Sequence, residues 1–268
     1  MLFSISNMKI RFTIKLISSK KKISSFIRKS ISLLLYSKFF AYFLNKYHKK
    51  LNYNEKEIIH NLYAKEFRHK KSRIRIKNWS VLFNGKIIYM PLRKTHMWLD
   101  WDSALSITGH DIDIKKTYEF LLDKLNIKCF FDVGANYCTH SILFLSHRIE
   151  TYSFEPNIRC KNYFNETLKL NSFKGNFINK ALGSTKGNST LTFPENDTWL
   201  GTISPKKDDF VNKFEKLNIV EIEIDTIDNF CKINKLSPNL LKIDTEGFEI
   251  NVLKGAVHQI KENNPIII

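Results

Sequence analysis

Acidic residues are missing from the start of the chain, because none precedes Glu55. Residues 1–100 hold 23 lysines and arginines against 4 acidic residues, whereas residues 101–268 hold 20 against 22. The net charge of +17 therefore belongs to the first third of the chain. A positively charged segment is attracted to phosphate. We therefore expect residues 1–50 to contact an anionic membrane surface, with nucleic acid as a weaker alternative. A solvated basic arm without a partner is the third interpretation.

Cysteine is scarce, and its spacing does not suit metal binding. The four cysteines form no C-x-x-C pair, which argues against a zinc site and against a disulfide framework. No other complete set of metal ligands is visible, so no metal is expected. Small buried thiols suit a reducing compartment, and the cytoplasm is the predicted location, with peripheral membrane association as an option. The four are Cys129, Cys138, Cys160 and Cys231.

Long apolar runs are also missing. A membrane-spanning helix needs roughly 18 or more consecutive apolar residues, and the nearest stretch, residues 30–45, is interrupted by Lys38. This stretch instead predicts a helix that lies on a membrane surface. A helix that caps the protein's own core is an equally good interpretation. The apolar side of the helix would carry Phe26, Ile27, Leu33, Leu34, Phe39, Phe40 and Phe43.

The pattern along the chain predicts three regions: a basic helical region at 1–78, a small β-rich region at 79–112 and an α/β core at 113–268. A polar helix is expected at 51–75. Two short strands are expected on either side of Asn84 and Gly85, because an Asn-Gly pair between apolar runs favours a tight hairpin turn. Apolar residues at helical spacing predict another helix at 113–127.

From Cys129 onward, short apolar runs alternate with helical patterns. Such alternation is typical of a mostly parallel sheet with helices on both faces. A hairpin around residues 188–192 is expected to interrupt the alternation. Strands are predicted at 129–133, 150–154, 176–182, 240–243 and 265–268, and helices at 139–148, 159–170 and 249–260.

Three short motifs follow the predicted strands. In the first motif, Asp132 closes a strand, and Gly134, Ala135 and Asn136 open the loop to the next helix. Glycine allows a tight turn and lets a ligand approach the backbone closely. An acid at this position could accept a hydrogen bond from the ammonium group of a ligand. An ordinary strand-to-helix turn is the alternative interpretation.

The second motif places an acid at the end of the next strand. Glu155 lies 21 residues after Gly134, where a carboxylate can accept both hydroxyls of a ribose, and Pro156 stops the strand. The loop after the first strand is not a complete G-x-G-x-x-G pattern, so paired glycines for a pyrophosphate are missing. A dinucleotide-dependent oxidoreductase is therefore disfavoured.

The third motif gathers carboxylates after a later strand. Asp244, Glu246 and Glu249 follow the apolar run at 240–243, at the edge where open α/β sheets bind ligands. Glu249 also begins a predicted helix, so stabilisation of a helix N-terminus is its alternative role.

The three motifs, in the order in which they occur along the chain, resemble those of the FkbM-type methyltransferase family. The resemblance covers about residues 113–268. It implies a class I, Rossmann-like methyltransferase fold, S-adenosylmethionine as the methyl donor, and O-methylation of a hydroxyl on a sugar, a polysaccharide or a secondary metabolite. The matching segments are Asp132-Val-Gly-Ala-Asn136, Phe154-Glu-Pro156, Leu241-Lys-Ile-Asp-Thr-Glu-Gly-Phe-Glu249 and Val252-Leu-Lys-Gly-Ala256.

The resemblance also implies which residues contact the donor and the acceptor. Asp244 and Glu246 would face the acceptor, and one of them would act as the general base that a sugar hydroxyl needs. His140, early in a predicted helix, is a weaker candidate for the base. The implied donor site consists of Asp132, Gly134, Ala135 and Asn136 at the methionine end, and Glu155 with Pro156 at the ribose.

Two features depart from the family pattern. A second glycine usually follows two residues after the asparagine, and here that position is Cys138, which adopts positive φ less easily than glycine. The chain also stops at Ile268, inside the predicted fifth strand, where the family normally continues through two more strands. The sequence is therefore expected to be a C-terminally truncated version of the fold.

Two alternatives to an O-methyltransferase stay open. A truncated fold could be catalytically inactive. An RNA methyltransferase could use the basic arm to hold its substrate. The RNA alternative is disfavoured, because amino-methylating enzymes usually place an Asn/Asp-Pro-Pro-aromatic motif after the fourth strand, where this chain has Asp244-Thr-Glu-Gly247.

Overall fold

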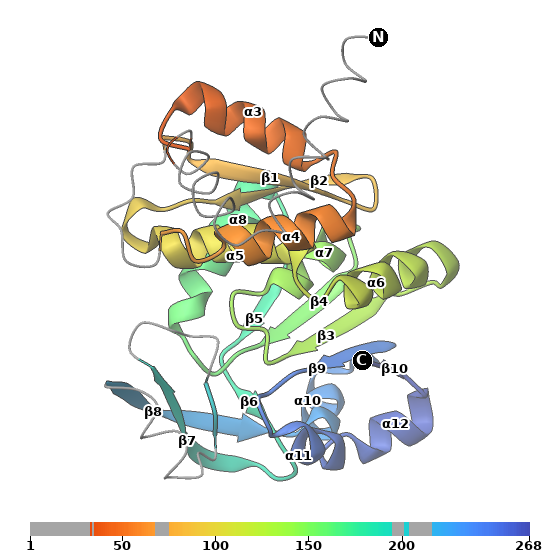
Figure 1. The fold of residues 1–268 in the computed structure, drawn as a ribbon. Helices are drawn as coiled ribbons and strands as arrows, with labels where there is room; N and C mark the ends of the chain where they lie inside the picture. Colours follow the sequence, from red (N-terminus) through yellow and green to blue (C-terminus); the bar gives the residue numbers. More distant parts are fainter. Residues whose placement is uncertain (1–32, 34, 68–74, 195–200, 204–215) are drawn as a thin grey trace. The chain divides into compact units, whose positions relative to one another are not determined.

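The computed structural model describes residues 33, 35–67, 75–194, 201–203 and 216–268 (Figure 1). The chain forms two compact units, Met1–Phe120 and Leu121–Ile268. Three residues of the predicted membrane-surface helix, namely Phe26, Ile27 and Leu34, lie outside the described residues. Each helix in the described part of the chain is too short or too polar to cross a bilayer.

A two-stranded hairpin organises the first unit. Strands β1 (Asn78–Phe83) and β2 (Lys86–Pro91) pair antiparallel. Asn84 and Gly85 both have positive φ, 38° and 74°, as a tight two-residue turn between twisted strands requires. The hairpin predicted from the Asn-Gly pair is therefore confirmed.

Helices cover both faces of this hairpin (Figure 1). On one face, α3 (Lys38–His48) is joined to β1 through Asn45, whose side chain makes three hydrogen bonds to Ser80. On the other face, α5 (Met97–Gly109) contacts both strands, and Trp101 packs edge-on against Trp79 with ring centroids 5.0 Å apart. The hairpin is therefore a thin layer between two helices.

The remaining elements of the first unit pack on α5. Helix α4 (Tyr53–Tyr63) starts with a capping box formed by Asn52 and Glu55, and the indole of Trp101 donates a hydrogen bond to the carbonyl of Tyr63 at 2.8 Å. The polar helix expected at 51–75 is thus shorter than predicted, and residues 68–74 lie outside the described part. A short 3-10 helix, η1 (Lys94–His96), leads into α5.

Helix α5 was not predicted from the sequence. Eleven of its 13 residues are buried, so the helix is covered on almost every side. A helix buried all round shows no one-sided periodicity, and the pattern by which surface helices are recognised is therefore absent.

The second unit contains a five-stranded sheet with the order β10-β9-β3-β4-β5, in which every neighbouring pair is parallel. The predicted α/β class with a mostly parallel sheet is confirmed. Helix α6 (Ile112–Lys124), predicted at 113–127, crosses the division between the two units. The strands of the sheet are β3 (Cys129–Val133), β4 (Glu150–Phe154), β5 (Asn176–Ile178), β9 (Leu240–Ile243) and β10 (Ile266–Ile267).

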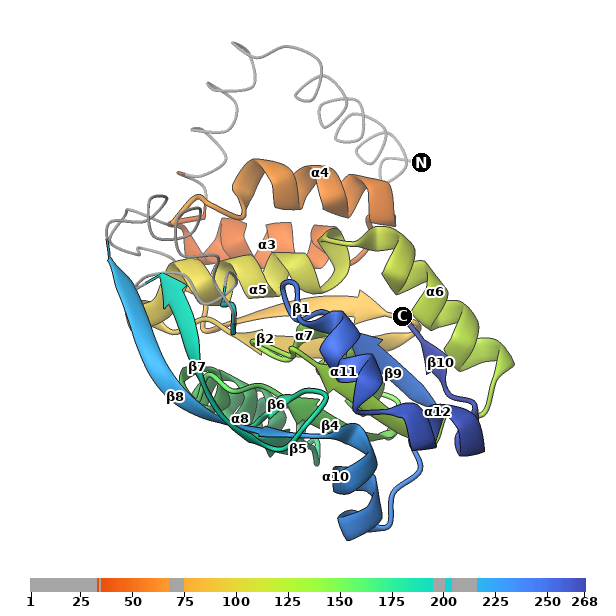
Figure 2. The ribbon, with the colours of Figure 1, turned by 90° about the horizontal axis from the view of Figure 1, so that it is seen from below.

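Helices cover both faces of the parallel sheet (Figure 1, Figure 2). Successive residues of a strand point to opposite faces. Phe130 accordingly packs against Phe144 of α7, whereas Phe131 packs against Phe230 of α10. Helices α7 (Thr139–Leu145) and α8 (Arg159–Asn171) lie on the first face, and α10 (Ile227–Asn234), α11 (Glu249–Lys254) and α12 (Val257–Asn263) lie on the second.

The region after β5 differs from its prediction in two ways. The single strand expected at 176–182 is wrong: after Ile178 the chain turns, with the amide of Lys180 bonded back to the carbonyl of Ile178, and β6 (Ala181–Leu182) joins another sheet. The hairpin expected at 188–192 is also wrong. Strand β7 (Gly187–Pro194) continues through it and pairs antiparallel with the unpredicted β8 (Leu217–Asp225), a partner too distant in sequence for local turn signals to reveal.

The prediction of a single helix at 249–260 is also wrong. The segment forms two helices, α11 and α12, and the chain bends between them at Gly255. A side chain at Gly255 could not be accommodated, since a Cβ atom there would lie 1.9 Å from the carbonyl oxygen of Gly183. The close contact between these two backbone segments bends the chain away from a straight helix. The strand predicted at 265–268 is confirmed as β10, which pairs with β9.

Candidate active site

The predicted motifs meet at one edge of the parallel sheet. From β3 the chain continues to β4 and β5 on one side, whereas β9 and β10 lie on the other side. Connections diverge at such a switch point, and open α/β sheets bind ligands outside the carboxyl ends of the strands there. Because β3 pairs parallel with both β4 and β9, the loops after these three strands all lie at this edge.

Gly134 is where the loop after β3 touches the loop after β9. Its amide donates to the carbonyl of Phe154 at 3.0 Å, and the amide of Asp244 donates to the carbonyl of Val133 at 3.1 Å. A Cβ atom at Gly134 would lie 1.9 Å from the carbonyl oxygen of Asp244, and φ at Gly134 is +75°. Both the close approach and the backbone conformation therefore demand glycine.

Cys138 occupies the position where the family pattern has a glycine. It adopts φ +59° and ψ +30°, so it takes the left-handed conformation that glycine would take more easily. The cost of this conformation is about 1 kcal/mol for a residue with a Cβ atom. The side chain is fully buried, and burial raises the pKa of the Cys138 thiol well above its usual range. Cys138 is therefore a neutral packing residue that preserves the turn.

Glu155 lies at the end of β4 and is only 7% exposed. One carboxylate oxygen accepts from the amide of Asn136 at 2.8 Å, and the other accepts from the amide of Asn157 at 2.7 Å. Burial raises the pKa of Glu155 to about 7, although these two amides oppose the shift. The side chain of Asn179 holds the same loop, because it donates to the carbonyls of Glu155 and Pro156 at 3.0 and 2.8 Å.

Asp132 faces the protein interior. Its carboxylate is fully buried and accepts hydrogen bonds from the amide and the hydroxyl of Ser141, at 3.0 and 2.6 Å. The hydroxyl of Ser153 in turn donates to Ser141 at 2.7 Å. Asp132 thus fixes the first turn of α7 to the sheet. The donor-binding role expected for Asp132 stays a prediction.

Lys242 is the central residue that the sequence did not reveal as part of the site. Its ammonium lies 3.5 Å from the carboxylate of Asp132, 3.2 Å from that of Asp244 and 3.4 Å from the carbonyl of Gly134. Burial lowers the pKa of Lys242, but the two carboxylates outweigh burial and raise it overall. The sequence signal that could have revealed it is a lysine within an otherwise apolar strand. A charge buried there needs a partner of opposite charge.

The carboxylates after β9 have different environments. Asp244 is exposed and paired with Lys242, whereas Glu249 accepts from the amides of Thr245 and Gly247 at 2.8 and 3.1 Å. Glu249 therefore stabilises the turn that leads into α11, as its alternative role requires. Glu246 has φ +53°, and its pKa is raised by burial and by the neighbouring acids Asp244 and Glu249.

His140 lies in the first turn of α7 and is half-buried. Pro156 is also half-buried and directly follows Glu155. Over the described ranges, no group of three histidine, cysteine or acidic side chains has the arrangement of a metal site.

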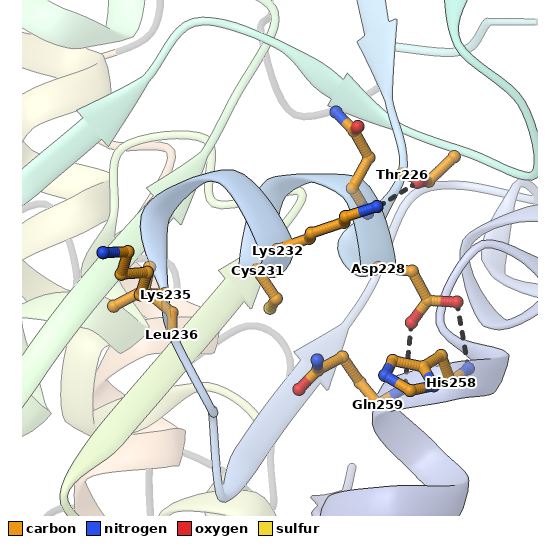
Figure 3. A pocket seen from close by; sticks show the side chains of 9 residues that line it. Thr226, Asp228, Cys231, Lys232, Lys235, Leu236, His258 and Gln259 are labelled. Carbon is orange, nitrogen blue, oxygen red and sulfur yellow. Dashed lines mark hydrogen bonds between the residues drawn. The ribbon is translucent and has the colours of Figure 1, made fainter.

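A separate hollow of about 700 Å³ lies between α10 and α12 (Figure 3). The carboxylate of Asp228 lies in this hollow and accepts from the amides of His258 and Gln259, both at 2.9 Å. Lys232 and Lys235 also line it. None of the predicted donor or acceptor residues contributes to the lining, so the hollow is distinct from the edge described above.

The parallel sheet and the glycine-bearing loop at its switch point define the second unit as a Rossmann-like ligand-binding fold. Residues 132–268 match the family model described as the methyltransferase FkbM domain, and the chain belongs to this family. Membership confirms the resemblance seen in the motifs and implies a methyl donor. No curated protein matches the sequence significantly.

The solved structures that are similar to the chain include the crystal structure of methyltransferase FkbM from Methylobacillus flagellatus KT. The sequences are 16% identical, and the TM-score is 0.36. The alignment covers 66% of the present chain and 44% of the other. The chain thus spans less than half the length of that protein.

Replacing Gly134 with alanine should destabilise the second unit. We expect a loss of about 3 kcal/mol in the free energy of unfolding, because the new Cβ collides with the Asp244 carbonyl and positive φ becomes strained. The measurement is urea unfolding followed by circular dichroism. Gly187→Ala is the matched control, since a Cβ at Gly187 meets nothing within 4 Å. Equal stability of the two variants would contradict the proposed contact.

Removing the ammonium of Lys242 should cost more than removing an exposed one. We expect Lys242→Met to lose about 3–5 kcal/mol of unfolding free energy, because the buried carboxylate of Asp132 is left without a counter-charge. Lys261→Met, at an exposed position of α12, should change stability by no more than about 0.5 kcal/mol. Adding Asp132→Asn to Lys242→Met should restore part of the loss. A Lys242 variant as stable as the control would refute this account.

Proposed function

We propose that the protein transfers a methyl group from S-adenosylmethionine to a hydroxyl of a sugar, a polysaccharide or a secondary metabolite. Membership in the FkbM family supports the reaction class. The observation that carries the donor assignment is the position of Glu155, a buried carboxylate one strand away from the switch-point loop. In a doubly wound fold, this is where an acid binds a ribose.

The remaining hydrogen-bond acceptor positions of Glu155 suit the two hydroxyls of a ribose. A carboxylate has about four lone-pair sites, and the amides of Asn136 and Asn157 occupy one on each oxygen. One acceptor position is left on each oxygen, which matches two neighbouring hydroxyl donors. The backbone of Gly134, Ala135 and Asn136 would then line the methionine end. When bound, S-adenosylmethionine would supply an electrophilic methyl group on its sulfonium.

The acceptor hydroxyl needs a base, because a sugar hydroxyl is a poor nucleophile. Asp244 and Glu246 both follow β9, but their environments differ. Asp244 is engaged in an ion pair, because the ammonium of Lys242 lies 3.2 Å from its carboxylate. Glu246 has a raised pKa, closer to neutrality, and a base is most effective when its pKa is near the working pH. We therefore assign the base to Glu246 and the orientation of the loop to Asp244.

Donor binding should depend on pH through Glu155. The pKa of this acid is raised to about 7, so its proton is gained as the pH falls through 7, and the carboxylate loses acceptor capacity. We expect S-adenosylmethionine to bind about tenfold more weakly at pH 6 than at pH 8 in calorimetric titrations. Glu155→Gln should weaken binding by about 1.5–3 kcal/mol at pH 8 and abolish the pH dependence.

Glu262→Gln, at an exposed position, is the matched control and should behave like the unaltered protein. Binding that is independent of pH would contradict the role of Glu155. Failure of a well-folded protein to bind S-adenosylmethionine at either pH would overturn the donor assignment itself.

Glu246→Gln should impair transfer and spare donor binding. We expect kcat to fall by about 10²–10⁴-fold, the usual contribution of a general base, with an unchanged affinity for S-adenosylmethionine. The assay measures S-adenosylhomocysteine released with a panel of mono- and disaccharides as acceptors. Asp244→Asn is measured in parallel. A large fall in Asp244→Asn with normal turnover in Glu246→Gln would assign the base to Asp244.

A further inference from the structure

Helix α3 carries its aromatic side chains on the outside. The residues that it buries are Ala41, Asn45 and His48, which are small or polar. Aromatic side chains dominate its first two turns, yet they are exposed: Phe39 by 74%, Phe40 by 42%, Tyr42 by 69% and Phe43 by 50%. An ordinary amphipathic helix has the opposite arrangement, with aromatic residues facing the core.

The helical repeat explains how these side chains form one surface. Residues four apart lie on the same face of a helix, so Phe39 and Phe43 lie together. The same spacing places Ala41 and Asn45 on the packed side, roughly opposite. Lys46, three residues after Phe43, is also exposed and extends the outer face by one turn.

The hairpin beneath α3 adds apolar side chains to the same side. Ser80, which is bonded to Asn45 of α3, shares a strand face with Leu82, because alternate residues of a strand point the same way. Ile87 pairs with Leu82, and Tyr89 pairs with Ser80, so they belong to this face too. Leu82, Ile87 and Tyr89 are 37%, 49% and 44% exposed. The apolar surface therefore extends from α3 onto the strands that it covers.

We propose that this surface, called here the α3 surface, docks on an anionic lipid membrane. It is formed by Phe39, Phe40, Tyr42, Phe43 and Lys46 of α3 together with Leu82, Ile87 and Tyr89 of the hairpin. Large exposed apolar patches mark interaction sites, and aromatic side chains next to lysines are typical of helices that lie at a membrane interface. Charge complementarity selects anionic lipid, because no acidic residue precedes Glu55 and residues 1–100 hold 23 lysines and arginines.

Nucleic acid would share the positive charge but not the apolar part of the surface. Aromatic rings can stack on bases, whereas the aliphatic Leu82 and Ile87 have no such partner in a nucleic acid. Lipid acyl chains accept both kinds of side chain. A membrane therefore accounts for the whole surface, and nucleic acid accounts for its aromatic and basic parts alone.

The test is co-sedimentation of the full chain with vesicles. Phosphatidylcholine vesicles with about 30 mol% phosphatidylglycerol should bind the protein, and vesicles of phosphatidylcholine alone should bind it at least about tenfold more weakly. Phe39→Ser combined with Phe43→Ser should weaken binding to the anionic vesicles by about tenfold or more. The matched control is Phe120→Ser in α6 combined with Leu125→Ser directly after it, where the side chains are 59% and 45% exposed, and its binding should change by less than about twofold.

Three results would overturn the proposal. Equal vesicle binding by the α3 variant and the unaltered protein would mean that basic charge alone attracts lipid. A lower melting temperature of the α3 variant than of its control would mean that the protein itself covers Phe39 and Phe43. A change from dimer to monomer in sedimentation velocity, seen in the α3 variant alone, would identify a second copy of the chain as the occupant.

Discussion

The ammonium of Lys242 holds the site edge together. It lies between the carboxylate of Asp132 in β3 and that of Asp244 after β9, so it joins the two strands at which the chain topology diverges. Asp132 also accepts the amide of Ser141 at the start of α7, and the position of this helix therefore depends on the same buried cation. A lysine at this depth is tolerable only because both carboxylates compensate its desolvation. The loop that carries Gly134 is fixed in turn, since its carbonyl lies 3.4 Å from the ammonium.

The buried carboxylate of Glu155 is stabilised in a different way from that of Asp132. Two backbone amides hold the Glu155 carboxylate, and in the described part of the chain the ammonium of Lys242 acts on it through space without forming an ion pair. Amides stabilise the ionised form less than a paired cation does, so burial dominates and the pKa rises to about 7. The difference suits the two assigned tasks. The carboxylate of Asp244 is paired with the ammonium of Lys242, whereas Glu155 keeps lone pairs that a neutral donor such as a ribose hydroxyl can use.

Much of the second unit could be predicted because its signals are local. The strand from Glu150 to Phe154 was predicted to the residue, since its β-branched and aromatic residues and the acid and proline that follow them are readable from neighbours alone. The pairing of β7 with β8 could not be predicted, because the partners are separated by more than twenty residues of chain. Prediction of the site was limited in the same way, by contacts between distant parts of the chain. The acids were visible at the strand ends, but the inward orientation of Asp132 and its pairing with Lys242 depend on which strands become neighbours.

The outward aromatic face of α3 follows from how this helix is anchored. The side chain of Asn45 donates to the carbonyl of Ser80 and accepts from its amide and its hydroxyl, at 2.7, 3.0 and 2.8 Å. Turning the helix to bury Phe39 and Phe43 would break all three bonds and leave buried polar groups unpaired, at about 1–3 kcal/mol for each group. The rotation of α3 is therefore set by a polar contact, and the aromatic side chains cannot turn inward to gain burial. Burial of these side chains must come from a surface outside the packed hairpin, and the basic residues around them decide which surface is attracted.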